Sequence, residues 1–472
     1  MKALIVGVGK LGFKLAGSLL QEGYEICVID NNEDVIENVS NVLDVFSICA
    51  NALDFGVLKE LDMSTFDVVI STTTNDEANV ILCSISKKLG AKYSIARVGD
   101  PEYREYLRFM SNELEIDKII NPDYATAKVI DKYLLKKYQL YANELAGGKV
   151  KLVEFNIARD PEFVGKNLIE LDAFENLLIA AISRDGKAIV PNGKTELKND
   201  DVILLAGMAE DIEEFDKKYS GISKVKNVKK VMILGGGKVG FYLASLLVNE
   251  NIDVTVIEID RDKCLNIKEK LPSVEVINGD GTDINLLEEE MIHTFDAYVA
   301  ATGIDEANLL MSLVVKRAGI YKSVAKISRT NYDGIIDKLN IDAVFNKSYI
   351  TASEILEIIR GNDAQAVSLL LNGQVECNEF IIKKKLAICG HSLKELNLPK
   401  GILFIALIRE DKTIIPNGNT VLEDNDKAVV FVTKDEINNM KKLFKRNNLF
   451  DGIQNKLEKV SNRGKNESIA NS

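Results

Sequence analysis

One sequence pattern is used twice along this chain. Three segments of the first half recur in order in the second: 4–13 as 232–241, 76–79 as 305–308, and 189–193 as 414–418. Chance does not produce three ordered matches at nearly constant offset, so the chain has the organisation A-B-A′-B′. Any fold inferred for one half must therefore also serve for the other.

The A parts have the pattern of a parallel α/β sheet. In the first copy, apolar runs at 2–6, 25–30, 67–72 and 93–98 alternate with longer stretches of helical character. Such alternation is typical of βαβ units, in which helices cover both faces of a parallel sheet. We expect two Rossmann-like, doubly wound parallel-sheet domains, each followed by a small α+β domain.

The B parts have a different pattern of apolar runs and turn signals. Four apolar runs are separated by Arg-Asp-Gly and Pro-Asn-Gly turn signals, which favours antiparallel strands with short helices near 166–171 and 209–218. We expect these boundaries: a Rossmann domain at 1–121, a helical connector at 122–149, a small domain at 150–220, a second Rossmann domain at 228–345, a second helical connector at 346–371, a second small domain at 372–446, and a polar tail at 447–472.

Composition excludes several classes of protein. The 59 Lys and Arg residues are outnumbered by 71 Asp and Glu, a net charge of −12, which disfavours broad binding to nucleic acid. No run approaches the ~18 apolar residues of a membrane span, and the N-terminal apolar run is too short for a signal peptide. The six Cys fall singly without a zinc spacing, as expected of reduced thiols in a cytoplasmic protein without a metal site.

Each A part carries a G-x-G-x-x-G loop between an expected strand and helix, with an acid at the end of the next strand. This context predicts a dinucleotide site. The candidate cofactor-binding residues of the first half are Gly7, Val8, Gly9, Lys10, Leu11, Gly12, Asp30, Asn51, Ala52, Thr72, Thr73 and Arg97. Those of the second half are Gly235, Gly236, Gly237, Lys238, Val239, Gly240, Glu258, Asp280, Gly281, Ala301, Thr302 and Lys326.

Physical roles follow from the residue types. The first glycine of each loop permits a tight turn, the second lets the backbone approach a pyrophosphate, and the third allows close helix packing. The helix N-terminus offers free N–H groups to phosphates. Asp30 and Glu258 would accept hydrogen bonds from ribose hydroxyls and repel a 2′-phosphate, so NAD(H) is favoured over NADP(H).

The two sites differ in one loop. Gly279-Asp280 of the second half is replaced by Ala50-Asn51 in the first, so the two need not bind one nucleotide equally well. Arg97 and Lys326 end equivalent strands; for these cations, a phosphate contact and an interface salt bridge remain equally open alternatives.

Catalytic machinery is not evident. His293 and His391 have no counterpart in the other half, and no pair of carboxylates or Cys/His arrangement recurs. Hydride transfer needs a proton donor or acceptor near the nicotinamide. We therefore expect no catalytic residues and no enzyme activity. An NAD-dependent oxidoreductase and a Rossmann scaffold that binds nothing remain alternatives.

The duplicated pattern resembles the RCK (regulator of K⁺ conductance) family, in the tandem form found in cytosolic subunits of Trk potassium uptake systems. The likeness rests on the two glycine loops with their acids, on the repeated Asp-Glu-Ala-Asn segments, and on Gly165-Lys166-Asn167 and Gly390-His391-Ser392 before the Pro-Asn-Gly turns. It implies TrkA-N Rossmann domains and TrkA-C (RCK_C) small domains.

What the resemblance implies is a regulatory subunit that binds NAD(H), or ATP/ADP. It further implies a homotetrameric ring, cytoplasmic and held on the inner face of the cell membrane by a potassium channel-like Trk subunit. A regulator of another cation channel or antiporter is the alternative. The two connectors are then candidate assembly surfaces.

Overall fold

The computed structural model describes residues 1–103, 106–135, 142–145, 149–157, 160–171, 177–184, 187–191, 194–219, 227–329, 332, 336, 339–360, 367–370, 375–410 and 412–444. Within these residues, no helix combines the length and the apolar character needed to cross a lipid bilayer. The expected polar tail at 447–472 lies outside them, as do Asn192 and Gly193 of the first Pro-Asn-Gly turn.

The first A part is a six-stranded parallel sheet covered by helices. Its elements are β1 (Lys2–Val6), α1 (Lys10–Gln21), β2 (Glu25–Asp30), α2 (Glu33–Val42), β3 (Phe46–Cys49), α3 (Phe55–Glu60), β4 (Val68–Ser71), α4 (Asp76–Lys88), β5 (Ser94–Arg97), α5 (Leu107–Glu113) and β6 (Lys118–Ile120). The strand order is β3-β2-β1-β4-β5-β6 and the pairs are parallel. This is the order of a dinucleotide-binding Rossmann fold, so the predicted fold class is confirmed.

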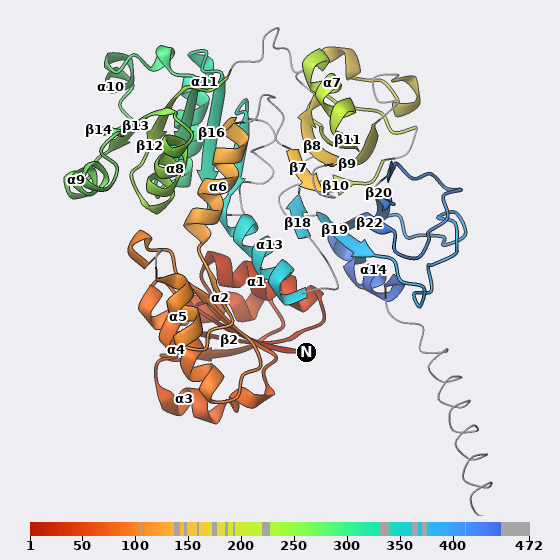
Figure 1. The fold of residues 1–472 in the computed structure, drawn as a ribbon, viewed down its shortest axis with the longest axis horizontal. Coiled ribbons are helices and arrows are strands. Elements are labelled where there is room, and N and C mark those ends of the chain that lie inside the picture. The colour runs from red at the N-terminus through yellow and green to blue at the C-terminus, as the bar shows by residue number, and fades with distance from the viewer. Residues whose placement is uncertain are drawn as a thin grey trace, which may run out of the picture.

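The second A part repeats this arrangement (Figure 1). Its elements are β12 (Lys230–Leu234), α8 (Lys238–Asn249), β13 (Asp253–Glu258), α9 (Arg261–Lys270), β14 (Glu275–Asn278), α10 (Ile284–Glu289), β15 (Ala297–Ala300), α11 (Asp305–Arg317), β16 (Lys322–Ile327) and β17 (Ala343–Asn346). The strand order β14-β13-β12-β15-β16-β17 matches that of the first sheet position by position.

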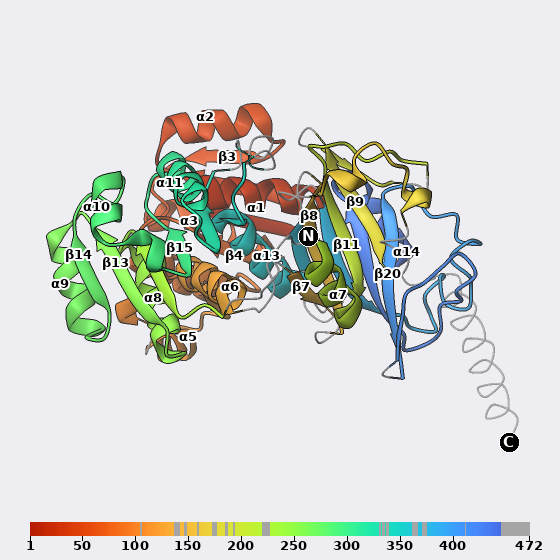
Figure 2. The ribbon, with the colours of Figure 1, turned by 90° about the horizontal axis from the view of Figure 1, so that it is seen from above.

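The B parts are antiparallel sheets with few helices. The first contains β7 (Ala142–Leu145), β8 (Val150–Asn156), β9 (Leu178–Arg184), β10 (Lys187–Ile189), β11 (Val202–Met208) and α7 (Ala209–Tyr219). The second contains β18 (Val367–Leu370), β19 (Val375–Ile381), β20 (Ile402–Arg409), β21 (Lys412–Ile414), β22 (Lys427–Thr433) and α14 (Ile437–Leu443). The two sheets lie face to face (Figure 2), with Val150 and Leu204 of one sharing a core with Val375 and Phe431 of the other.

Among the described residues of the two connectors, the helices occupy the first parts. They form α6 (Pro122–Leu135) and α13 (Lys347–Arg360), whereas the expected helical ranges ran to 149 and 371. Their last described residues, β7 and β18, pair antiparallel with β8 and β19. That part of the expectation is corrected. Gly147-Gly148 and Asn372-Gly373 follow these strands in the sequence, and such dipeptides favour hairpins over helix.

Helices α6 and α13 are exchanged between the two halves. In Figure 1, α6 runs from the first sheet into the second A part, and α13 runs in the opposite direction. The fully buried face of α6, which packs in the core around α8, consists of Ala127, Ile130, Tyr133 and Leu134. The corresponding face of α13, packed in the core around α1, consists of Ala352, Ile355 and Leu356. The apolar faces expected to assemble separate subunits are thus covered within one chain.

Candidate functional site

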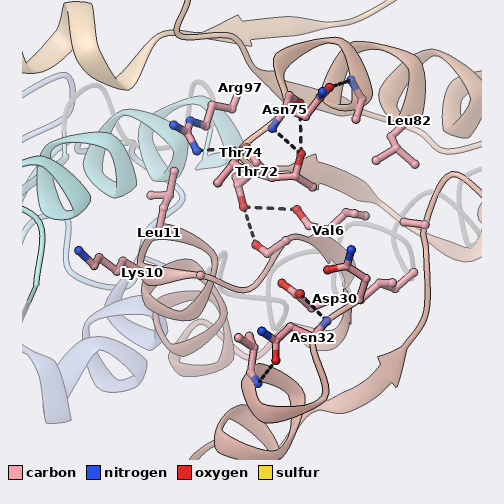
Figure 3. A pocket seen from close by; sticks show the side chains of 18 of the residues that line it. Val6, Lys10, Leu11, Asp30, Asn32, Thr72, Thr74, Asn75, Leu82 and Arg97 are labelled. Atoms are coloured by element: carbon pink, nitrogen blue, oxygen red, sulfur yellow. Dashed lines mark hydrogen bonds between the residues drawn. The ribbon is translucent and has the colours of Figure 1, made fainter. Parts of the chain in front are cut away.

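A cleft of about 930 Å³ opens at the carboxyl ends of the strands of the first sheet (Figure 3). It lies where the strand order reverses between β1 and β4, which is where ligands bind in open α/β sheets. The predicted residues that line it are Gly7, Gly9, Lys10, Leu11, Asp30, Asn51, Ala52, Thr72, Thr73 and Arg97. Two predicted residues do not line it: the Val8 side chain is buried, and Gly12 lies beneath the loop.

A Cβ atom would meet different surroundings at each of the three glycines of the first loop. Gly7 has φ +85°, and a Cβ there would lie 2.7 Å from the Thr73 backbone nitrogen. A Cβ at Gly12 would lie 2.1 Å from the Gly7 carbonyl oxygen. Gly9 has no atom within 4 Å of its Cβ position and an ordinary extended backbone. Gly7 and Gly12 are therefore required by the fold, whereas Gly9 keeps the floor of the cleft open.

The N-terminus of α1 is left without a side-chain cap. It begins after Gly9, which makes no capping hydrogen bond. Neighbouring helices are capped: Asn32 accepts from two backbone N–H groups of α2, and Asn75 accepts from one of α4. The first N–H groups of α1, with Lys10 beside them, are thus available to an anion such as a phosphate.

Asp30 holds the glycine loop from the end of β2. Its carboxylate accepts from the Val8 N–H at 2.8 Å and the Asn32 N–H at 3.0 Å. An ionised carboxylate has about four acceptor positions, so two bonds leave room for ribose hydroxyls. In the second half, the Glu258 carboxylate takes the equivalent bond from the Gly236 N–H at 2.7 Å.

The loop after β4 forms the opposite wall. The Thr72 hydroxyl donates to the Gly7 carbonyl oxygen at 2.8 Å, and Arg97 donates from Nη1 to the Thr73 carbonyl oxygen at 3.1 Å. The Nε of Arg97 is buried and has no hydrogen-bond partner within the described structure. In the second half, Lys326 donates to the Thr302 carbonyl oxygen at 2.8 Å, and burial lowers its pKa. Arg97 and Lys326 therefore each donate a hydrogen bond to the neighbouring loop of their own Rossmann domain.

The second glycine loop repeats the first sterically. A Cβ at Gly240 would lie 2.0 Å from the Gly235 carbonyl oxygen, Gly235 has φ +103°, and the Cβ position of Gly237 is open. Asp280 accepts from the Thr282 N–H and hydroxyl, which lowers the Asp280 pKa.

Four other predicted residues of the second half are confined by close packing, by burial or by an ion pair. A Cβ at Gly281 would lie 2.0 Å from Leu234 Cδ1, and Val239 and Ala301 are buried. Lys238 reaches across to Asp76 of the first half, 3.3 Å away.

Two kinds of functional residue were missed in the sequence. Asn79, fully buried on α4, accepts from the Thr73 N–H at 2.9 Å and donates to the Arg97 carbonyl oxygen at 2.9 Å, so it holds the cleft wall. Its repeat Asn308 does the same at Thr302 and Lys326. The other missed residues line the first cleft from the second half: Ser328, Lys347, Ser348 and Thr351. The repeated Asp-Glu-Ala-Asn segment was a signal for Asn79 and Asn308. No local sequence pattern points to the four lining residues that come from the second half.

Fold and site together define a class: a duplicated Rossmann protein with one uncapped glycine-loop helix in each half and a small antiparallel domain after each. The TrkA-N domain family matches residues 3–122 and 231–347, and the TrkA-C domain family matches 152–220 and 378–445. The chain belongs to the TrkA family.

Named relatives match over nearly their full length. A Trk system potassium uptake protein TrkA homolog of Methanosarcina mazei is 31% identical over 94% of this chain and 100% of its own. The Trk system potassium uptake protein TrkA of Haemophilus influenzae is 30% identical over 95% of this chain and 100% of its own. Among solved structures, the GsuK RCK domain has a TM-score of 0.55 at 18% identity, covering 94% of both chains, a likeness of fold.

Proposed function

We propose that this protein is a nucleotide-binding regulatory subunit that gates a membrane potassium uptake channel of the Trk type. The observation that carries the proposal is the first cleft, which is lined by the uncapped N-terminus of α1, Lys10 and Asp30 and is open at the Cβ position of Gly9. Phosphates of the nucleotide would accept hydrogen bonds from the free N–H groups at the start of α1, and its ribose hydroxyls would donate to the Asp30 carboxylate. The full-length match to relatives named for Trk potassium uptake supports the same function.

We further propose NAD(H) as the ligand, with ATP or ADP as an alternative occupant. A structure of similar fold is described as the GsuK channel bound to NAD, and another as GsuK bound to ADP.

Gating requires that the nucleotide binds two arrangements of the protein with different affinities. A ligand with equal affinity for both leaves their populations unchanged. The exchanged helices α6 and α13 give the two halves a shared interface through which one cleft acts on both. A ring of four chains on the cytoplasmic face of the channel subunit is part of this proposal.

Thermal unfolding with NADH, NAD, ATP or ADP tests nucleotide binding. At about 100 times the Kd, a bound nucleotide raises the free energy of unfolding by about 2.7 kcal/mol, which is a measurable rise in Tm. No rise with any of the four nucleotides would refute the proposed function.

A further inference from the structure

The first cleft has a wall supplied by the second half. Lys347, Ser348 and Thr351, at the start of α13, line it together with the glycine loop. The Asn346 side chain fixes this helix start by accepting from the Ser348 N–H at 2.9 Å. Figure 3 shows the cyan ribbon of α13 passing beside Leu11 and Arg97. The wall is held by packing, since Lys14 of α1 lies over the Tyr349 ring, 4.5 Å from its centroid.

Three cations from three elements line this cleft: Lys10 at the start of α1, Arg97 at the end of β5, and Lys347 at the start of α13. The lining also has two carboxylates, Asp30 and Glu77. Asp30 accepts from the Val8 N–H, and Glu77 accepts from the Tyr103 hydroxyl at 2.5 Å. The lining therefore has one more cation than carboxylate, an excess of positive charge that an anionic ligand would balance.

Lys347 is paired with Asp123, near the start of α6. The pair is largely buried, and Asp123 Oδ2 has no hydrogen-bond partner within the described structure. Burial lowers the pKa of Lys347, Asp123 opposes this lowering, and the nearby charges of Arg97 and Lys238 add to it. An anion in the cleft would relieve this crowding of cations.

At the equivalent helix start, that of α6, the charged residue is the acid Asp123 and not a lysine. The repeat aligns Asn121 with Asn346, so Pro122-Asp123 stands where Lys347-Ser348 stands. Lys238 of the second loop lies 3.3 Å from Asp76 and 3.6 Å from Asp100, two carboxylates of the first half. Lys238 of the second loop thus has two carboxylate partners, whereas within the described residues Lys10 of the first loop has none and Lys347 has Asp123.

We propose that Lys347 binds a phosphate of the nucleotide in the first cleft, across the boundary between the halves, and makes that cleft selective for nucleoside polyphosphates. This rests on the proposed nucleotide binding. Lys347 exchanges its ion pair with Asp123 for one with phosphate, so occupancy of the first cleft changes the contact between α13 and α6. A charge-assisted bond of this kind is worth enough to change affinity about tenfold.

Calorimetric titration with ATP and with AMP tests the proposal, in a Gly237→Ala background that closes the second loop. Lys347→Met weakens ATP binding about tenfold and AMP binding about threefold or less, and Lys347→Arg restores most of the ATP affinity. Asp123→Asn tightens ATP binding, because it removes the internal competitor for Lys347. Lys128→Met, an exposed lysine of α6, is the matched control and leaves both affinities unchanged.

ATP affinity unchanged in Lys347→Met, or Asp123→Asn weakening ATP as much as Lys347→Met does, overturns the proposal and leaves the pair a structural bridge. If Lys347→Met does not fold, Asp123→Asn still decides it, because the proposal requires tighter ATP binding in that variant. Failure of the proposed function looks different, because the Gly237→Ala protein with Lys347 intact would then bind neither nucleotide.

Discussion

The backbone N–H of Val8 donates to the carboxylate of Asp30 at 2.8 Å, joining the glycine loop to the end of the neighbouring strand. The same bond joins Gly236 to Glu258 in the second half. One acid thus orients the loop and presents its remaining oxygens to the cleft. Loop geometry and ligand affinity depend on the same carboxylate.

Replacing Asp30 tests both roles. Asp30→Ala is expected to weaken NADH binding about tenfold or more, because ribose loses a charged acceptor worth about 1.5–3 kcal/mol. Asp30→Asn keeps an acceptor oxygen for Val8 but removes the charge that repels a 2′-phosphate, so the affinity ratio of NADH to NADPH falls. Calorimetric titration measures the ratio; an unchanged ratio would contradict the role given to Asp30.

Gly9 and Gly12 form a matched pair of substitutions. Gly9→Ala meets open space and ordinary backbone angles, so the Tm without ligand stays within a few degrees while nucleotide no longer raises it. Gly12→Ala meets the Gly7 carbonyl oxygen and costs about 3 kcal/mol or more of stability. Thermal unfolding with and without NADH separates the two, and equal loss of stability in both variants would disprove the assignment.

Asp131 on α6 sets a pH dependence of stability. Burial raises its pKa to about 6, the charge of Glu250 adds to the shift, and Lys132 opposes it. The folded state therefore holds this proton more tightly than the unfolded chain, whose Asp pKa is about 3.9, and stability falls as pH rises between about 4 and 6. Because the carboxyl is partly exposed, we expect Asp131→Asn to stabilise by about 1 kcal/mol at pH 7. Urea unfolding at pH 7 and pH 4 checks this, since the gain must vanish at pH 4.

The exchanged helices predict which half responds to a core substitution. Ile130→Ala in α6 removes a fully buried side chain from the core around α8, at a cost of about 2–5 kcal/mol. Hydrogen exchange is then expected to speed up in the second sheet, around β12 and β13, more than in the first. Ile355→Ala in α13 is the reciprocal control and affects the first sheet. Faster exchange confined to the sheet nearest in sequence would contradict the exchange of helices.

Sequence patterns predicted much of the fold because they are local. The glycine loops, the acids at Asp30 and Glu258, and the strands of both small domains each have a periodicity or turn signal of their own. The strand β7 was missed because its short sequence follows a helix without a strong breaker, although the dipeptide Gly147-Gly148 is a turn signal in the sequence.

The contribution of Lys347 to the first cleft had no local signal. An amphipathic helix shows which of its faces is buried but not which copy of a repeated domain buries it. The cores around α1 and α8 come from the same repeat, so only the tertiary structure distinguishes α13 packed on its own half from α13 packed on the other.

The most direct test of gating is rubidium uptake into potassium-loaded proteoliposomes that contain a Trk-type membrane subunit. Adding this chain and a nucleotide that binds it is expected to change uptake severalfold, and Gly9→Ala is expected to abolish the nucleotide's effect while the chain still joins the membrane subunit. Rubidium uptake that stays unchanged, although the chain binds the membrane subunit and the nucleotide binds the chain, would contradict the regulatory function.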